Sequence, residues 1–243
     1  MLAELRAMSP AARLLVVNQT GVNLGFYMVL PFLASYLIDD VGMAAAAVGL
    51  TLGARVLSQQ GLFLPSGVAV DRFGPKYSIV AGCALRVVAF TGLGLADDQV
   101  IVVAAVLLIG VAGALFNPAA RTYLALEAPE RRAEAFAVFE VFGNIGALMG
   151  PVLGALLLVA DFRASCLLAA VVFAVLTVAQ LLVLPRTSRP GEPTPVLAGL
   201  REVLGDRRFG LLVLAMSAYL ALFNQLYLTI PIEAQRVTGN GAS

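Results

Sequence analysis

Long apolar segments, separated by short polar connections, run through almost the whole chain. A helix needs about 20 mostly apolar residues to cross the hydrocarbon core of a bilayer. Seven segments reach that length, at residues 14–38, 44–70, 77–95, 100–123, 135–160, 164–184 and 209–232. Because most connections are short, we expect consecutive helices to run antiparallel. The pattern predicts an all-α integral membrane protein, with the lipid bilayer as its main partner.

Composition narrows the possible functions. Hydrophobic residues make up 60% of the chain and charged residues 13%, against about 25% charged in soluble domains. A net charge of +1 argues against a nucleic-acid partner. There is no histidine, and Cys83 and Cys166 both lie in apolar segments, where we expect plain core residues. No spacing of Ser, Asp or Cys suggests a nucleophile beside a base. We therefore expect no enzyme activity, no cofactor and no metal site.

Basic residues are divided unevenly between the two sides of the predicted spans. Twelve lie on the side of the N-terminus: Arg6, Arg13, Arg72, Lys76, Arg121, Arg131, Arg132, Arg186, Arg189, Arg201, Arg207 and Arg208. The other side carries Arg163 and Arg236, and its loops are rich in aspartate. Lys and Arg in short loops favour the cytoplasmic side. We expect a multi-pass protein of the cell (inner or plasma) membrane with a cytoplasmic N-terminus.

The connection between the second and third spans is short and densely charged. Its pattern is G-x-x-x-D-R-x-G-x-K, formed by Gly67, Asp71, Arg72, Gly74 and Lys76. This pattern resembles the loop between helices 2 and 3 of major facilitator superfamily transporters. The resemblance implies a gating loop, whose Asp71 carboxylate accepts charge-assisted hydrogen bonds that hold the outward-open state. The family usually has a basic residue after the second glycine, where this chain has Pro75. The alternative role is a basic membrane anchor with a helix-capping aspartate.

The predicted fifth span carries glycines at helical spacing. Gly146, Gly150 and Gly154 recur every four residues, and Pro151 follows the second. Small residues at this spacing let another helix approach closely. The order G-x-x-x-G-P-x-x-G also resembles the helix 5 motif of drug and metabolite exporters that work as antiporters in the same superfamily. That resemblance implies a hinge and favours export. Those exporters carry an embedded arginine on helix 4 where this chain has Val106, which weakens the case for proton coupling.

Charged residues inside or near the predicted spans need a separate explanation. A charge at the centre of a spanning helix costs roughly 2.5–3.5 kcal/mol, so it should face the bundle interior or a partner. Arg86 lies near the middle of its span, whereas Arg55 is close enough to a helix end to extend toward the membrane surface. Arg121 is predicted to be a basic anchor. Glu140 is the only acidic residue inside a span, and is our candidate proton carrier if protons pass through this half.

Uncharged polar side chains mark a candidate substrate cavity. The chosen residues are Asn23, Tyr27, Asn117, Asn224 and Tyr227, from the first, fourth and seventh predicted spans. Asn23 and Tyr27 are four residues apart and share one helix face. Amides and phenols suit a neutral or amphipathic small molecule. Hydrogen bonding between helices is the alternative role for each residue.

An internal repeat divides the chain. The pattern Y-x-x-x-P occurs at residues 27–31 and again at residues 227–231, and a Pro-rich polar stretch lies between them. The two halves of the resembled transporters are parallel repeats about an axis along the membrane normal. We predict a six-helix bundle at residues 1–185, and a cytoplasmic linker with a short amphipathic helix at 186–208. Residues 209–243 are then the first helix and external tail of an incomplete second half.

These observations predict a secondary transporter that exports hydrophobic drugs or metabolites by alternating access, with protons as the candidate coupling ion. Two alternatives stay open. One is an importer or facilitator of a small metabolite, and the other is a truncated membrane protein that transports nothing. The sequence has no ATP-binding P-loop, so the prediction does not include primary active transport by this chain alone.

Overall fold

The computed structural model describes residues 5, 8–158, 161–185, 207, 210–211, 214–216 and 218. The chain divides into two compact units, Met1–Gly191 and Glu192–Ser243, and each is considered by itself. The described residues of the second unit are helical. The predicted seventh span, the linker helix and the second copy of the Y-x-x-x-P repeat lie largely or wholly outside the described residues. The three-part division of the chain stays a prediction.

The first unit is built from helices joined by short connections. In chain order they are α2 (Pro10–Val29), η1 (Leu30–Phe32), α3 (Leu33–Asp39), α4 (Ala45–Gly61), α5 (Phe63–Phe73), α6 (Pro75–Leu95), α7 (Gln99–Glu127), α8 (Arg132–Leu158) and α9 (Phe162–Val183).

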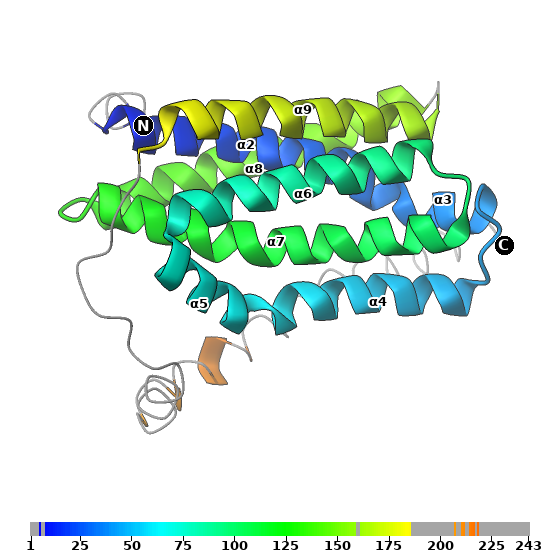
Figure 1. Ribbon diagram of the computed structural model, residues 1–243, viewed down its shortest axis with the longest axis horizontal. Helices are drawn as coiled ribbons and strands as arrows, with labels where there is room; N and C mark the ends of the chain where they lie inside the picture. Colours follow the sequence, from blue (N-terminus) through cyan, green and yellow to red (C-terminus); the bar gives the residue numbers. More distant parts are fainter. Residues whose placement is uncertain are drawn as a thin grey trace, which may run out of the picture. The chain divides into compact units, whose positions relative to one another are not determined.

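These elements form six spans that run back and forth along one direction (Figure 1). The first span consists of α2, η1 and α3, the second of α4 and α5, and the other four of single helices. We call one end of the bundle the basic end; there α2, α6 and α8 begin and α5, α7 and α9 finish. The opposite end, with the aspartate-rich connections, is the acidic end. Helices occupy all of the first six predicted segments, with ends that agree to within about one helical turn.

Two of the predicted spans are not continuous helices, and proline explains both interruptions. A proline inside a helix lacks the N–H for the ladder, and its ring clashes with the carbonyl four residues earlier. Pro31 lies in the 3₁₀ segment η1 between α2 and α3. Pro65 is four residues after Gly61, where α4 finishes, and Leu62 separates α4 from α5. The sequence alone had suggested one unbroken helix in each place.

Side-chain caps fix where several helices begin. The Ser9 hydroxyl accepts a hydrogen bond from the first turn of α2. At the acidic end, Asp98 Oδ1 accepts from the Val100 N–H at 2.8 Å, and Asp161 Oδ1 accepts from the Arg163 N–H at 3.0 Å. These carboxylates satisfy backbone donors that the helix itself leaves unpaired. The short connections at this end therefore have two roles, because they reverse the chain and also cap the start of the next helix.

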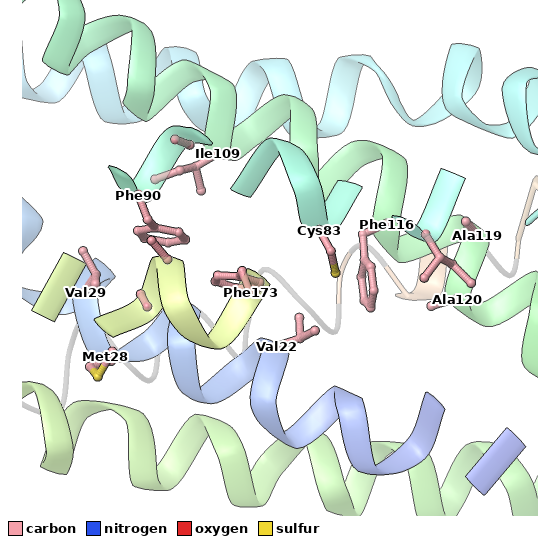
Figure 2. Packing of buried hydrophobic residues seen from close by; sticks show 14 of the residues in the cluster. Val22, Met28, Val29, Cys83, Phe90, Ile109, Phe116, Ala119, Ala120 and Phe173 are labelled. Carbon is pink, nitrogen blue, oxygen red and sulfur yellow. The ribbon is translucent and has the colours of Figure 1, made fainter. Parts of the chain in front are cut away.

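The interior of the bundle is packed with aromatic and aliphatic side chains, part of which Figure 2 shows. Phe90 of α6 and Phe173 of α9 stack with ring centroids 5.3 Å apart. Phe116 of α7 lies against Gly82 of α6, where an added Cβ would be 2.9 Å from the Phe116 Cβ. Cys83 and Cys166 are buried, free thiols, so the prediction that they are core residues is confirmed.

The outward face of the bundle is also apolar. Leu182 is 79% exposed, Leu148 76% and Val175 63%. Large apolar side chains exposed in such number on long helices are unfavourable in water and are matched by lipid. Five helices of the described part are long and apolar enough to cross a membrane; the α4–α5 span consists of two shorter helices. The protein is a multi-pass membrane protein.

Candidate substrate cavity

The predicted gating loop is a one-residue connection between α5 and α6. Gly74 has φ 85° and ψ 153°, a backbone conformation that side chains with a Cβ rarely adopt. Pro75 then begins α6, where its missing N–H costs no helical hydrogen bond. This position therefore accepts a proline where the sequence resemblance would have a basic residue. Lys76 Nζ donates to the Leu181 carbonyl of α9 at 3.0 Å, which joins the start of α6 to the last turn of α9.

The other residues of this motif lie on α5. Asp71 and Arg72 are exposed at the basic end, and the Arg72 guanidinium lies 5.6 Å from the Phe73 ring centroid. Gly67 faces open space, since a Cβ added there would meet nothing within 4 Å. The structure thus gathers the charged residues beside a tight turn. Their gating role stays a prediction.

The glycines of α8 lie against the backbone of α2. A Cβ added to Gly146 or Gly154 would overlap the carbonyl oxygen of Thr20 or Met28, respectively. At Gly150 it would lie 2.9 Å from the carbonyl oxygen of Leu24. The glycine face therefore permits the close helix approach expected from its spacing. Whether these glycines and Pro151, which lies inside α8, form a hinge stays a prediction.

A cavity of about 350 Å³ lies between four helices, toward the basic end of the bundle. Its lining combines three phenylalanines with amides and an ion pair. The lining residues are Gln19, Asn23, Phe63, Phe116, Asn117, Ala120, Arg121, Phe139 and Glu140. The structure thus brings together three of the predicted site residues, Asn23, Asn117 and Glu140. The size of the cavity and its combination of aromatic rings with polar and charged groups suit a small organic molecule that has both apolar and polar parts.

An ion pair between α7 and α8 supplies the charge of this cavity. Arg121 Nη2 lies 2.8 Å from Glu140 Oε1, and the two side chains are 59% and 52% exposed. Arg121 is therefore a partner of Glu140 and not only the basic anchor that the sequence suggested. Both residues are about two turns from the connection between α7 and α8. Counting back from that turn along the antiparallel helices could have predicted the pair.

Asn23 connects the cavity to the glycine face. Its Nδ2 donates to the Gly143 carbonyl of α8 at 2.9 Å, and its Oδ1 accepts from Gln19 Nε2 at 3.2 Å. Gln19 Oε1 is buried and accepts no hydrogen bond from the described residues. Asn23 thus has both roles that the sequence left open, since it joins two helices and lines the cavity. Gln19, an amide of the same predicted span, lines the cavity beside Asn23.

Tyr27 does not line this cavity; it lies beside Phe26, whose ring two arginine side chains approach. It is 38% exposed and packs edge-on against Phe26, with ring centroids 5.2 Å apart. Two arginine side chains also approach that ring. The Arg55 and Arg86 guanidinium carbons lie 5.8 Å and 6.0 Å from the Phe26 centroid. Arg55 therefore points into the bundle, and the expectation that it extends toward the membrane surface was wrong.

Two of the predicted cavity residues, Asn224 and Tyr227, lie outside the described residues. Within the described part, no group of three or more Cys, Asp or Glu side chains could hold a metal ion.

Comparison with known proteins places this bundle in a family. The sequence model of the Major Facilitator Superfamily matches residues 15–241. The chain belongs to the Major Facilitator Superfamily. An uncharacterised MFS-type transporter of Mycobacterium tuberculosis is 48% identical over 234 residues, which cover 96% of this chain and 56% of that protein. Multidrug resistance protein MdtH of Aeromonas hydrophila is 36% identical over 226 residues, which cover 93% of this chain and 57% of that protein.

The Major Facilitator fold is also found by structural comparison. A crystal structure of the peptide transporter POT matches with a TM-score of 0.61 and 18% identity, over 93% of this chain and 52% of the other. At that identity the likeness shows the fold alone. The chain spans about half the length of each of these superfamily members.

Proposed function

We propose that this chain forms the first half of a secondary transporter that exports hydrophobic or amphipathic small molecules by alternating access. Membership of the Major Facilitator Superfamily supports transport. The similarity to a multidrug resistance protein supports export. In transporters with two repeat halves, the halves rock about a site near the bilayer midplane. We propose the cell membrane as the location, with the basic end of the bundle on the cytoplasmic side.

The cavity of about 350 Å³ is the observation that carries this proposal. Phe63, Phe116 and Phe139 would contact the apolar part of a substrate. Asn23 and Asn117 would contact its polar groups, as few well-placed polar side chains fix orientation in such sites. The charged turn around Gly74 would control access at the basic end as the two halves change position.

Glu140 is the proposed proton carrier. Its carboxylate lines the cavity and pairs with Arg121. An exposed pair of this kind contributes at most about 1 kcal/mol to stability, so it can open during a transport cycle. Protonation of Glu140 would remove its negative charge and release Arg121.

Transport by inverted membrane vesicles tests the proposal. With an imposed pH gradient, we expect uptake of a hydrophobic fluorescent dye, accompanied by proton release from the vesicle lumen. Replacing Glu140→Gln should reduce the dye-driven proton flux at least tenfold. Glu130→Gln, in the exposed connection between α7 and α8, is the matched control and should have little effect. An unchanged proton flux in Glu140→Gln would remove Glu140 from the proton pathway.

The chain covers only about half of its relatives, so the experiment needs one further arm. The vesicle experiment is run both with the 243-residue chain alone and with the chain joined to a second half. A chimaera that continues this chain with the remaining part of the Mycobacterium tuberculosis relative would supply a second half. Flux by the chimaera but not by the chain alone would assign transport to the pair of halves. No flux by either would contradict the proposed function.

A further inference from the structure

Two arginines share the region around one aromatic ring in the middle of the bundle. Arg55 comes from α4 and Arg86 from α6, and both lie within 6.0 Å of the Phe26 ring of α2. Arg86 also lies 5.0 Å from the Phe116 ring and 5.3 Å from the Phe173 ring. Each of these three rings lies at about the middle of the span that carries it. Two positive charges thus lie near the same aromatic ring in the middle of the bundle.

Neither arginine has a carboxylate partner among the described residues. The ion pairs there join Arg121 to Glu140, Arg131 to Glu134 and Arg163 to Asp97. Arg86 is 3% exposed, and its Nε and Nη1 donate to no described residue. Arg55 Nε likewise has no partner in the described part, and its Nη1 makes only a long contact of 3.4 Å with Gln59 Oε1.

Aromatic rings compensate these charges only in part. Cation–π contacts are individually weak, and buried guanidinium donors without acceptors are costly. In a medium of low dielectric constant, two nearby positive charges produce a strong electropositive potential. That potential attracts an anion and repels a cation. A guanidinium also matches the planar fork of a carboxylate, with two parallel hydrogen bonds.

Arg55 is the member of the pair that a ligand can reach. It is only partly buried, whereas Arg86 is enclosed. Tyr27 packs against the same Phe26 ring, with ring centroids 5.2 Å apart, and is 38% exposed. Phe116 links the two regions, because it contacts Arg86 and also lines the cavity described above. An acid group at Arg55 would then belong to a molecule whose apolar body reaches toward Phe116 and the cavity.

We propose that Arg55 and Tyr27 form an anion-recognition site, reinforced by the charge of Arg86, and that the substrate is an amphipathic organic anion with a carboxylate or similar acid group. This deepens the proposed function and rests on it. The sequence had pointed to neutral or amphipathic substrates. The pair of arginines adds a defined charge and a defined position for it.

Binding of three matched probes tests the site without requiring transport. The probes are 2-naphthoate, 2-naphthamide and 2-naphthylmethylammonium, measured with the 243-residue protein in lipid nanodiscs, with empty nanodiscs as the reference for partitioning. We expect the carboxylate to bind at least tenfold more tightly than the amide, and the ammonium most weakly. Arg55→Gln should abolish the preference for the carboxylate over the amide. Arg55→Lys should restore part of it, since lysine keeps the charge without the planar fork.

Arg132→Gln is the matched control, because Arg132 is exposed at the basic end and remote from the pair. It should leave the preference unchanged, and the thermal midpoint of each variant checks that it is folded. Equal binding of carboxylate and amide by the unaltered protein would overturn the anion site, as would a preference that survives Arg55→Gln. Preferential, Arg55-dependent binding with no flux in the vesicle assay would support the site and contradict the transport proposal.

Discussion

At the scale of single residues, the most specific packing feature is the row of three glycines on α8. Gly146, Gly150 and Gly154 bring its backbone against that of α2. Their spacing in the sequence indicated a close helix contact, but not with which helix. Local spacing contains no information about the partner, because the contact joins residues more than a hundred positions apart.

Replacing Gly146→Ala should destabilise the bundle. The added Cβ would overlap the Thr20 carbonyl, and backbone cannot move aside as a flexible side chain can. Overpacking of this kind costs about 1–3 kcal/mol. The thermal midpoint in detergent, measured by loss of helical circular dichroism, should therefore fall.

Gly53→Ala is the matched control, since Gly53 is an exposed helical glycine whose added Cβ would meet nothing within 4 Å. It should keep or raise the midpoint, because alanine favours helix over glycine by about 1 kcal/mol. If Gly146→Ala were as stable as Gly53→Ala, the close contact between α2 and α8 would not exist.

At the scale of elements, the turn between α5 and α6 is the best-defined feature. Gly74 supplies the positive φ and Pro75 begins the next helix, so one residue reverses the chain. The sequence predicted this turn because its residue types have strong local preferences. The breaks at η1 and Leu62 also have local causes, in Pro31 and Pro65. Hydropathy did not predict these breaks, because the residues around both prolines are apolar.

Gly74→Ala should strain this turn. An L-residue held at φ 85° and ψ 153° costs about 1–3 kcal/mol. We expect a lower thermal midpoint and faster exchange of amide hydrogens at the start of α6, measured by mass spectrometry. Gly67→Ala, in the neighbouring helix with free space for a Cβ, should not reduce stability. Equal effects of both substitutions would show that the turn does not require glycine.

At the scale of the whole molecule, the described bundle has a basic and an acidic end. The sequence assigned the basic end to the cytoplasm from the excess of Lys and Arg in its loops. The structure groups these connections at a common end of the bundle. Their common position makes the orientation of the whole bundle measurable at single exposed sites.

Cysteine labelling in intact cells measures this orientation. In a Cys83→Ala, Cys166→Ala background, Gln99→Cys places an exposed thiol at the acidic end and Glu130→Cys places one at the basic end. A membrane-impermeant maleimide should label the first and not the second. After the cells are opened, both should react. Labelling of Glu130→Cys alone in intact cells would reverse the assigned topology.

The sequence by itself determined the number and approximate limits of the first six spans, their alternation and the tight turn at Gly74. These follow from hydropathy and from local backbone preferences, which act over a few neighbouring residues. Only the tertiary structure decided which interior charges meet. It paired Glu140 with Arg121 and placed Arg55 and Arg86 beside Phe26. Such contacts depend on helix rotation and on the packing of helices distant in the chain, which hydropathy does not specify.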